Sequence, residues 1–217
     1  MLQLKESYIN NIVITLQTKG YPVFSEPNKL NMVGIRSAFA STNKFDDLFI
    51  IFWKERNTWV GYSMPCTTDP GYFYLNKPIN HIGTAILVGG SYKYKVGLHR
   101  NQYKALVQNS SVTVIRDADR NNVIDWAAKK ETGWYGINIH RANVSNNAQN
   151  IENHSAGCQV IQNIDDYNFL MSKAITSQNM YGVGSLVYNL IDNSMIKNRV
   201  VAVAIAAAAA VLIYKFK

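Results

Sequence analysis

Cysteine is the scarcest residue type of this sequence. The 217 residues include only Cys66 and Cys158. Two cysteines cannot form the disulfide framework of a small secreted domain, and we expect both thiols to be reduced. Metal-binding patterns are missing as well, because the four histidines show neither HExxH spacing nor pairing with cysteines. We therefore expect no metal and no other cofactor.

A dense basic cluster is also missing, although positive charges are in excess. The formal net charge is +8 at pH 7, and several of the cations lie close to the C-terminus. A positive surface suits an anionic cell-wall polymer or a membrane. Nucleic-acid binding is not expected, because it would require the cations to be concentrated on one face or element.

The N-terminus lacks the pattern of a secretory signal peptide. Lys5 and Glu6 interrupt its apolar residues, which are periodic rather than continuous. Ile9, Ile12 and Leu16 recur at helical spacing, and Gly20 ends the pattern. We expect residues 1–29 to form a helix followed by a loop.

The C-terminus carries the longest uncharged stretch. Residues 200–214 are mainly Ala and Val, and a membrane-spanning helix needs about 20 residues. We expect residues 195–217 to form a hydrophobic helix, a candidate transmembrane segment that would anchor residues 196–217 in a bacterial envelope or virion membrane. The alternative is an Ala-rich helix packed against its own domain or a partner. Basic residues on both sides leave the orientation open.

Short β-type runs separated by turns occupy most of residues 30–194. Residues 47–54 and 58–64 predict a hairpin. Further strands are predicted at residues 84–88, 105–108, 111–115, 135–140 and 185–191. A helix capped by Asn163 or Asp165 is predicted to run to about residue 176. We expect a mostly β (α+β) domain, a sandwich or barrel with a few helices.

Residues that suggest chemistry gather around Cys158. Residues 155–158 read Ser-Ala-Gly-Cys, and His140 ends an apolar run upstream. The thiolate is the reactive form of cysteine, and an imidazole commonly generates it. This pattern predicts Cys158 as nucleophile and His140 as general base, later the acid for a leaving amine. A buried structural cysteine beside an unrelated histidine is the alternative.

Gly157 has a separate predicted role. Without a Cβ it permits a tight turn and the close approach of a substrate carbonyl. The backbone N–H groups of Gly157 and Cys158 are the expected donors to a developing oxyanion.

His140 together with residues 155–158 resembles the His…Ser-His-Gly-Cys signature of the YkuD-type L,D-transpeptidases. Residues 67–73, Thr-Thr-Asp-Pro-Gly-Tyr-Phe, are similar to the Thr-Pro-x-Gly-x-Phe segment of that family. The resemblance covers roughly residues 60–165. It implies an L,D-transpeptidase-like catalytic domain at residues 30–194, which attacks peptidoglycan stem peptides and forms a thioester on Cys158. It also implies that Ser155 supports the catalytic loop and that the carbonyl of Arg141 orients His140.

Two positions depart from the family pattern and bear on substrate choice. Ala156 replaces the His of Ser-His-Gly-Cys, and Val160 replaces the Arg that usually follows the Cys by two residues. Arg141, whose guanidinium can grip a carboxylate, is a candidate to replace that Arg; alternatively it is exposed without a specific role. His154 is either a partial replacement for the missing His or a solvated loop residue. Gln159 is the third candidate substrate-binding residue.

Residues 117–125 raise the question of calcium. Asp117, Asp119, Asn121 and Asp125 have EF-hand-like spacing. Gly and Glu are missing at the sixth and twelfth positions, and the run connects two β-type segments. A polar hairpin turn is the better interpretation.

Two functions remain open at the sequence level. One is a cell-wall cysteine transferase or hydrolase, an L,D-transpeptidase or an L,D-carboxy- or endopeptidase; the absence of a signal peptide suits a bacteriophage lytic enzyme or a tail-anchored protein. The other is a membrane-anchored structural or virion protein that keeps the fold without activity. A protein-cleaving cysteine protease is disfavoured, because the surroundings of Cys158 resemble neither the papain nor the caspase type.

Overall fold

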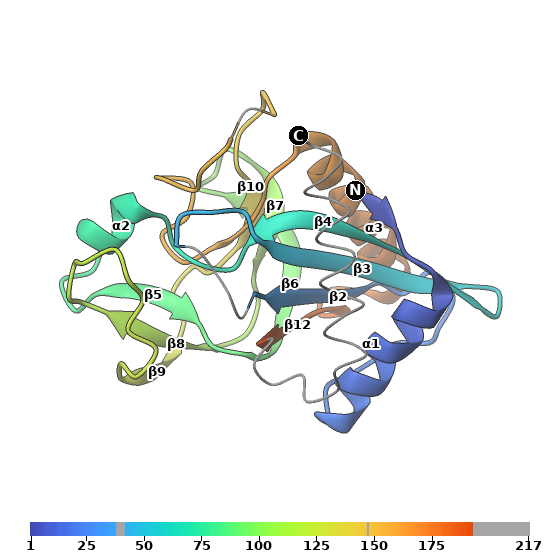
Figure 1. Cartoon of the computed structure of the whole chain (residues 1–217). Helices are drawn as coiled ribbons and strands as arrows, with labels where there is room; N and C mark the ends of the chain where they lie inside the picture. The colour runs from blue at the N-terminus through green and yellow to red at the C-terminus, as the bar shows by residue number, and fades with distance from the viewer. Residues whose placement is uncertain (38–41, 147, 193–217) are drawn as a thin grey trace.

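The chain folds around a closed β-barrel. The computed structural model describes residues 1–37, 42–146 and 148–192, of which 38% are strand and 19% helix. The larger sheet contains β1 (Leu2–Gln3), β2 (Asn31–Arg36), β3 (Asp47–Glu55), β4 (Thr58–Thr67), β6 (Gly90–His99), β7 (Tyr103–Gln108), β10 (Ile139–Arg141), β11 (Gln159–Ile161) and β12 (Leu186–Asp192). Its strand order is β1-β4-β11-β10-β7-β6-β12-β2-β3, and the pairing of β3 with β4 closes eight of the strands into a barrel (Figure 1). The mostly β prediction is confirmed.

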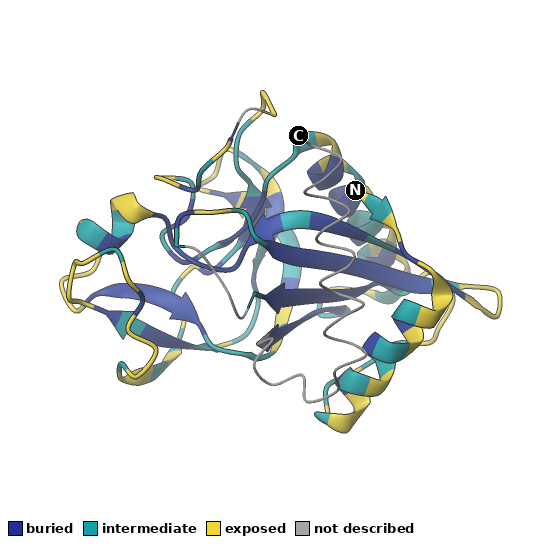
Figure 2. Cartoon of the chain, viewed as in Figure 1, coloured by how far each residue is buried: buried dark blue, intermediate teal, exposed yellow. Residues whose placement is uncertain are grey.

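Strand β3 shows why the barrel has a continuous apolar signal in the sequence. Phe49 and Ile51 belong to the larger hydrophobic core, whereas the alternate residues Ile50 and Phe52 belong to a second core. The strand is thus covered on both faces, so polar residues do not alternate with apolar ones. The burial colouring shows the same strands dark along most of their length (Figure 2).

Two long helices cover this barrel. Helix α1 (Glu6–Thr18) buries Ile9, Ile12 and Leu16 in the second core, and its opposite face is exposed (Figure 2). Helix α3 (Ile164–Tyr181) packs its buried face into the larger core. The Asn163 side chain caps α3 by accepting hydrogen bonds from the N–H groups of Asp165 and Asp166. Both helices were predicted, and α3 extends one turn further than expected.

A small lobe stands apart from the barrel, at the left of Figure 1. It consists of β5 (Thr84–Leu87), β8 (Val112–Asp117), β9 (Lys130–Gly133) and the short helix α2 (Tyr72–Asn76). Leu75 of α2 packs on Ile86 and Ile115 of this sheet. Residues 117–125, whose spacing resembles that of an EF-hand loop, run from the last residue of β8 into the connection to β9. There the Asp125 N–H donates to the Asp117 carboxylate. Within the described residues, no group of three or more His, Cys, Asp and Glu side chains could hold a metal ion.

The predicted hairpin of residues 47–64 is confirmed as β3 and β4. The strand predicted at residues 135–140 is wrong over its first part, because β10 begins only at Ile139. The N–H groups of Tyr135 and Ile137 donate to the side-chain oxygen of Gln108 instead of to a neighbouring strand. The buried side-chain amide of Gln108 thus replaces the backbone hydrogen bonds to a neighbouring strand that the sequence pattern predicts.

The predicted C-terminal helix at residues 195–217 lies outside the described residues. Among the helices of the described part, none combines the length and apolarity that crossing a bilayer requires.

Candidate active site

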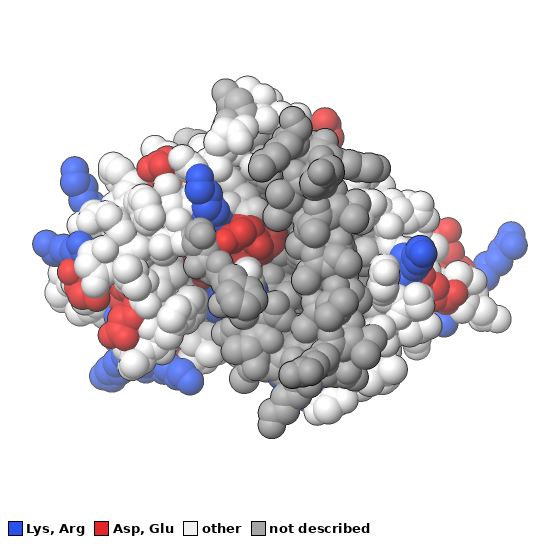
Figure 3. Space-filling model, in the orientation of Figure 1, with Lys and Arg blue, Asp and Glu red and all other residues white. Residues whose placement is uncertain are grey.

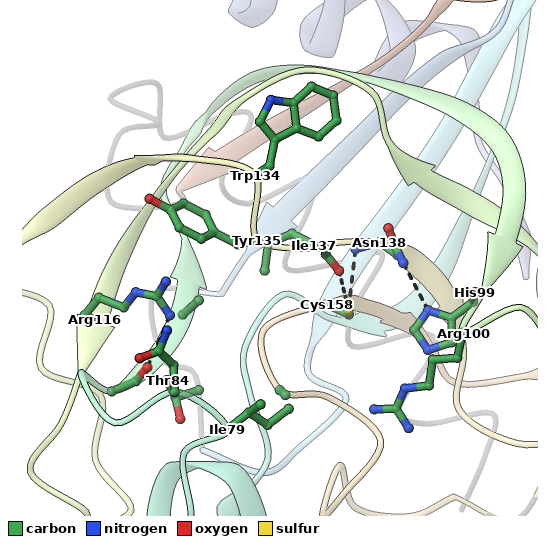
Figure 4. Close-up of a pocket in the computed structure, with 15 residues that line it drawn as sticks. Ile79, Thr84, His99, Arg100, Arg116, Trp134, Tyr135, Ile137, Asn138 and Cys158 are labelled. Atoms are coloured by element: carbon green, nitrogen blue, oxygen red, sulfur yellow. Dashed lines mark hydrogen bonds between the residues drawn. The ribbon is translucent and has the colours of Figure 1, made fainter.

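Cys158 lies in a cleft of about 530 Å³ between the barrel and the small lobe. Ala85 and Arg116 contribute from the small sheet, His99 and Arg100 from the end of β6, and Asn138 from the segment before β10 (Figure 4). Cys66, by contrast, is fully buried in the larger core. Of the two thiols, only Cys158 is placed to meet a substrate.

The Cys158 thiol is held by the backbone of the adjacent segment. Its Sγ is 3.5 Å from the Gly136 carbonyl oxygen, to which it donates, and it accepts from the Asn138 N–H at 3.4 Å (Figure 4). Burial raises the pKa of the thiol, against the opposing effects of the Asn138 N–H and the positive charge of Arg100. The thiol is therefore protonated at neutral pH, and it would need a base to act as a nucleophile.

His140 has the tautomer that a base needs. Its Nδ1 is 2.8 Å from the carbonyl oxygen of Arg141. A carbonyl oxygen can only accept, so the proton of the neutral ring lies on Nδ1 and the lone pair on Nε2. This is the orienting contact that the family resemblance implies. His140 is 5% exposed, and burial, together with the neighbouring His99, lowers its pKa to about 3.

The strand register places His140 and Cys158 on one face. In the parallel pairing of β10 with β11, His140 is opposite Val160, and Ile139 is opposite Gln159. Cys158 precedes Val160 by two residues, so its side chain leaves the same face as that of His140. Within the described residues no hydrogen bond joins the two side chains, because the thiol is turned toward Gly136. Rotation about the Cα–Cβ bond of Cys158 is the movement that would turn the thiol away from Gly136.

The loop before Cys158 is closed by Ser155. The Ser155 hydroxyl donates to the Cys158 carbonyl at 2.8 Å and accepts from the Gly157 N–H at 3.1 Å. Gly157 has a φ of +118°, and a Cβ at this position would lie 2.0 Å from the Ala85 carbonyl oxygen. The Ser155 hydroxyl thus closes the tight turn at Gly157. The Gly157 N–H, which was expected to stabilise an oxyanion, is engaged by Ser155 instead.

The segment at residues 67–71 supports this loop from the other side. The Gly71 N–H donates to the Ser155 carbonyl at 3.0 Å, and a Cβ on Gly71 would lie 2.0 Å from the Glu152 carbonyl oxygen. The preceding Asp69 forms a buried ion pair with Arg36 at 2.9 Å. Residues 67–71 are thus a brace for the loop that carries Cys158.

The three residues predicted to bind substrate lie outside the residues that line the cleft. The Arg141 guanidinium stacks on Tyr103 at 3.9 Å. Gln159 is fully buried and accepts from the Tyr188 hydroxyl at 2.9 Å. His154 is half-buried, and burial lowers its pKa. The side chains of Arg141 and Gln159 are engaged by residues distant in the sequence, which the sequence pattern could not reveal.

Other polar residues line the cleft without having been singled out in the sequence. Arg100 follows His99 at the β6–β7 turn, where Arg100 and Asn101 both have positive φ. Arg116 is paired with Glu131 at 3.1 Å. Trp134, 67% exposed, stands at the rim (Figure 4). The alternating residues of β6 are the signal from which this hairpin could have been predicted.

The depressed pKa of His140 gives a testable dependence of stability on pH. The folded ring resists protonation, whereas in the unfolded chain it titrates near 6.5; its contribution is therefore complete above pH 6.5 and is lost as the pH falls toward 3. Between pH 7 and pH 5 we expect the free energy of unfolding to fall by about 2 kcal/mol from this group. Urea denaturation of the wild type and His140→Asn measures it, since Asn keeps a donor for the Arg141 carbonyl and cannot titrate. An equal pH dependence of both proteins would contradict the buried neutral ring.

Charges outside the cleft are mixed. On the face shown in Figure 3, basic and acidic side chains lie close together at the edge of the small lobe. Lys29 and Glu26 form one ion pair outside the cleft.

No protein-family model, curated protein or solved structure matches this chain.

Proposed function

We propose that the protein is a cysteine acyl-transfer enzyme that acts on peptidoglycan stem peptides, similar to the YkuD-type L,D-transpeptidases and divergent from them. The observation that carries the proposal is the pair formed by Cys158 and His140. Cys158 lines the cleft, and His140, on the same face, has its Nδ1 proton bound by Arg141 and its Nε2 lone pair unprotonated. Ser155, Gly157 and the brace at residues 67–71 hold the loop in a fixed shape.

The chemistry follows from these protonation states. The Cys158 thiol gives its proton to Nε2 of His140 as sulfur attacks the acyl carbon of the stem peptide. The C–N bond then breaks, and the leaving amine takes the proton from His140, which leaves a thioester on Cys158. An incoming amine gives transfer and water gives hydrolysis, and in either case His140 accepts the proton and the thiol is restored. The same site would serve as transpeptidase, carboxypeptidase or endopeptidase, according to the acceptor.

The cleft supports a peptide with an anionic group. Arg100 is exposed at the cleft, and its positive charge partly opposes the burial that raises the pKa of the Cys158 thiol. It replaces Arg141 as our candidate to hold a substrate carboxylate. Anchoring through residues 196–217, and a role in a bacteriophage or bacterial envelope, remain part of the proposal on sequence grounds.

The test is incubation of the full chain with purified muropeptides, with and without an added amine acceptor, followed by mass spectrometry of the products. We expect shortened stem peptides without the acceptor and acceptor-linked products with it. Unchanged muropeptides under both conditions would contradict the proposal.

A structural or virion protein that retains the fold is the second candidate. It is favoured by the raised pKa of Cys158, the absence of a described hydrogen bond from its thiol to His140, and Ala156 in place of the family histidine. An inert wild type whose Cys158 also resists a simple acylating ester would favour this alternative.

A further inference from the structure

A second histidine faces the cleft from the barrel wall. His99 is the last residue of β6, 7% exposed, and it lines the cleft together with Cys158 (Figure 4). Its ring stacks on that of His140, with centroids 4.1 Å apart and an interplanar angle of 29°. His140, in contrast, is not among the residues that line the cleft. Of the two rings, His99 is therefore the one that a substrate in the cleft would meet first.

The protonation state of His99 follows from a chain of hydrogen bonds. The backbone N–H of Gln108 donates to the side-chain oxygen Oδ1 of Asn138 at 3.1 Å. This contact fixes the orientation of the Asn138 side-chain amide, with Oδ1 toward Gln108. The Asn138 amide nitrogen is consequently the atom that faces Nδ1 of His99, at 3.2 Å. Because an amide NH₂ group donates, Nδ1 of His99 accepts. The proton of the neutral ring therefore lies on Nε2, on the side of the ring away from Asn138 (Figure 4).

The two stacked rings thus have opposite tautomers. His140 carries its proton on Nδ1, bound to Arg141, and presents a lone pair at Nε2. His99 accepts at Nδ1 and presents a hydrogen-bond donor at Nε2. Burial lowers the pKa of His99 as well, with a further contribution from Arg100. The arrangement is a base and a donor fixed side by side, each by its own backbone-anchored partner.

The loop that carries Cys158 lacks a second hydrogen-bond donor for an oxyanion, and the Nε2–H of His99 is a candidate for it. The Gly157 N–H is engaged by Ser155 and is not free to stabilise an oxyanion. Among the described contacts of the loop, the Cys158 N–H has no acceptor, which leaves it as one oxyanion donor. A tetrahedral oxyanion is stabilised best by more than one donor.

We propose that His99 is a second catalytic histidine, whose Nε2–H donates a hydrogen bond to the acyl oxygen of the substrate while Cys158 attacks. The assignment rests on the acyl-transfer function proposed above. In the first step the S–C bond forms, the thiol proton passes to His140, and the carbonyl π pair moves onto oxygen, where His99 and the Cys158 N–H donate to it. When the C–N bond breaks, the oxygen returns its pair to carbon and the amine leaves with the proton from His140. His99 keeps its own proton throughout.

The first part of the test is the tautomer itself, which does not depend on the substrate. Long-range ¹H–¹⁵N spectra of the ¹⁵N-histidine-labelled full chain at pH 7 should show the His99 proton on Nε2 and the His140 proton on Nδ1. Assignment comes from His99→Gln and His140→Asn. A His99 proton on Nδ1 would overturn the proposal whatever the enzyme acts on.

The second part is the rate at which 4-nitrophenyl acetate acylates Cys158, followed by nitrophenolate release and by protein mass. His99→Phe keeps an aromatic ring against His140 and removes the donor, and we expect it to slow acylation about 10²-fold. His99→Gln, whose amide NH₂ can reach the Nε2 position, should restore at least a tenth of the wild-type rate, whereas His99→Asn, which reaches only the Nδ1 position, should not. His81→Phe is the matched control, because His81 is exposed and is not among the residues that line the cleft; it should acylate as the wild type does.

The outcomes separate the two proposals. Equal acylation by the wild type and His99→Phe, or equal rates for the Gln and Asn variants, would overturn the role of His99. Should His99→Phe fail to fold by circular dichroism, the comparison of Gln with Asn decides alone. Slow acylation in the Phe and Asn variants, together with inert muropeptides, would uphold His99 and reject peptidoglycan as the substrate.

Discussion

Replacing Cys158 by alanine should abolish product formation from muropeptides, with a fall in rate of at least about 10³-fold. The reason is that Cys158 is the thiol that lines the cleft, and the thioester cannot form without it. The free energy of unfolding should change little, since the side chain is partly exposed and its hydrogen bonds to Gly136 and Asn138 are long. Rates are measured by liquid chromatography of muropeptides, and stability by urea denaturation.

Cys66→Ala is the matched control for that experiment. Cys66 is buried in the larger core, where burial raises its pKa well above the usual value. Its loss should cost about 1 kcal/mol of stability through the small cavity left behind, with the activity retained. Activity that survives in Cys158→Ala and disappears in Cys66→Ala would reverse the assignment of the nucleophile.

Gly157→Ala should lower both the stability of the protein and its rate of acyl transfer. At a φ of +118° a residue with a Cβ is strained, and the new Cβ would lie 2.0 Å from the rigid carbonyl of Ala85. The loop must move, which breaks the hydrogen bonds of Ser155 and displaces Cys158. We expect a loss of roughly 3 kcal/mol in the free energy of unfolding and a fall in acyl transfer of at least about 10²-fold.

Gly184→Ala separates the cost of the left-handed backbone from the cost of the steric clash with Ala85. Gly184 also has a left-handed φ, +98°, but nothing lies within 4 Å of the position that its Cβ would occupy. It should show only the backbone cost, about 1 kcal/mol, with activity unchanged. Urea midpoints and acylation rates of both variants give the comparison. Similar losses in the two proteins would show that the close approach to Ala85 does not define the site.

The parts of the fold that could be predicted are those in which local pattern and environment agree. The hairpin of β3 and β4 has a tight turn between apolar runs, and α3 has an Asn163 cap followed by helical spacing. Residues 135–138 do not form the predicted strand because the side chain of Gln108, distant in the sequence, accepts the N–H groups of Tyr135 and Ile137. No local signal records such a partner.

The same limit applies to the site. His140, Ser155, Gly157 and Cys158 lie in a spacing that predicts their proximity, and the structure brings them to one loop and one strand face. His99 lies at the site because β6 pairs with β7, where His99 is opposite Tyr103, and because its ring stacks on that of His140. The candidate substrate-binding residues were sought beside His140 and Cys158 in the sequence, whereas the cleft is lined by residues of the β6–β7 turn and of the small sheet.

The reaction itself is tested most directly by trapping the covalent intermediate. The full chain is mixed with a muropeptide substrate, quenched in acid within seconds and measured by intact-protein mass spectrometry. We expect an added mass equal to the acyl fragment, located on the peptide that contains Cys158 and removed by hydroxylamine, as a thioester is. A mass that is unchanged while products form, or an adduct that maps elsewhere, would contradict acyl transfer through Cys158.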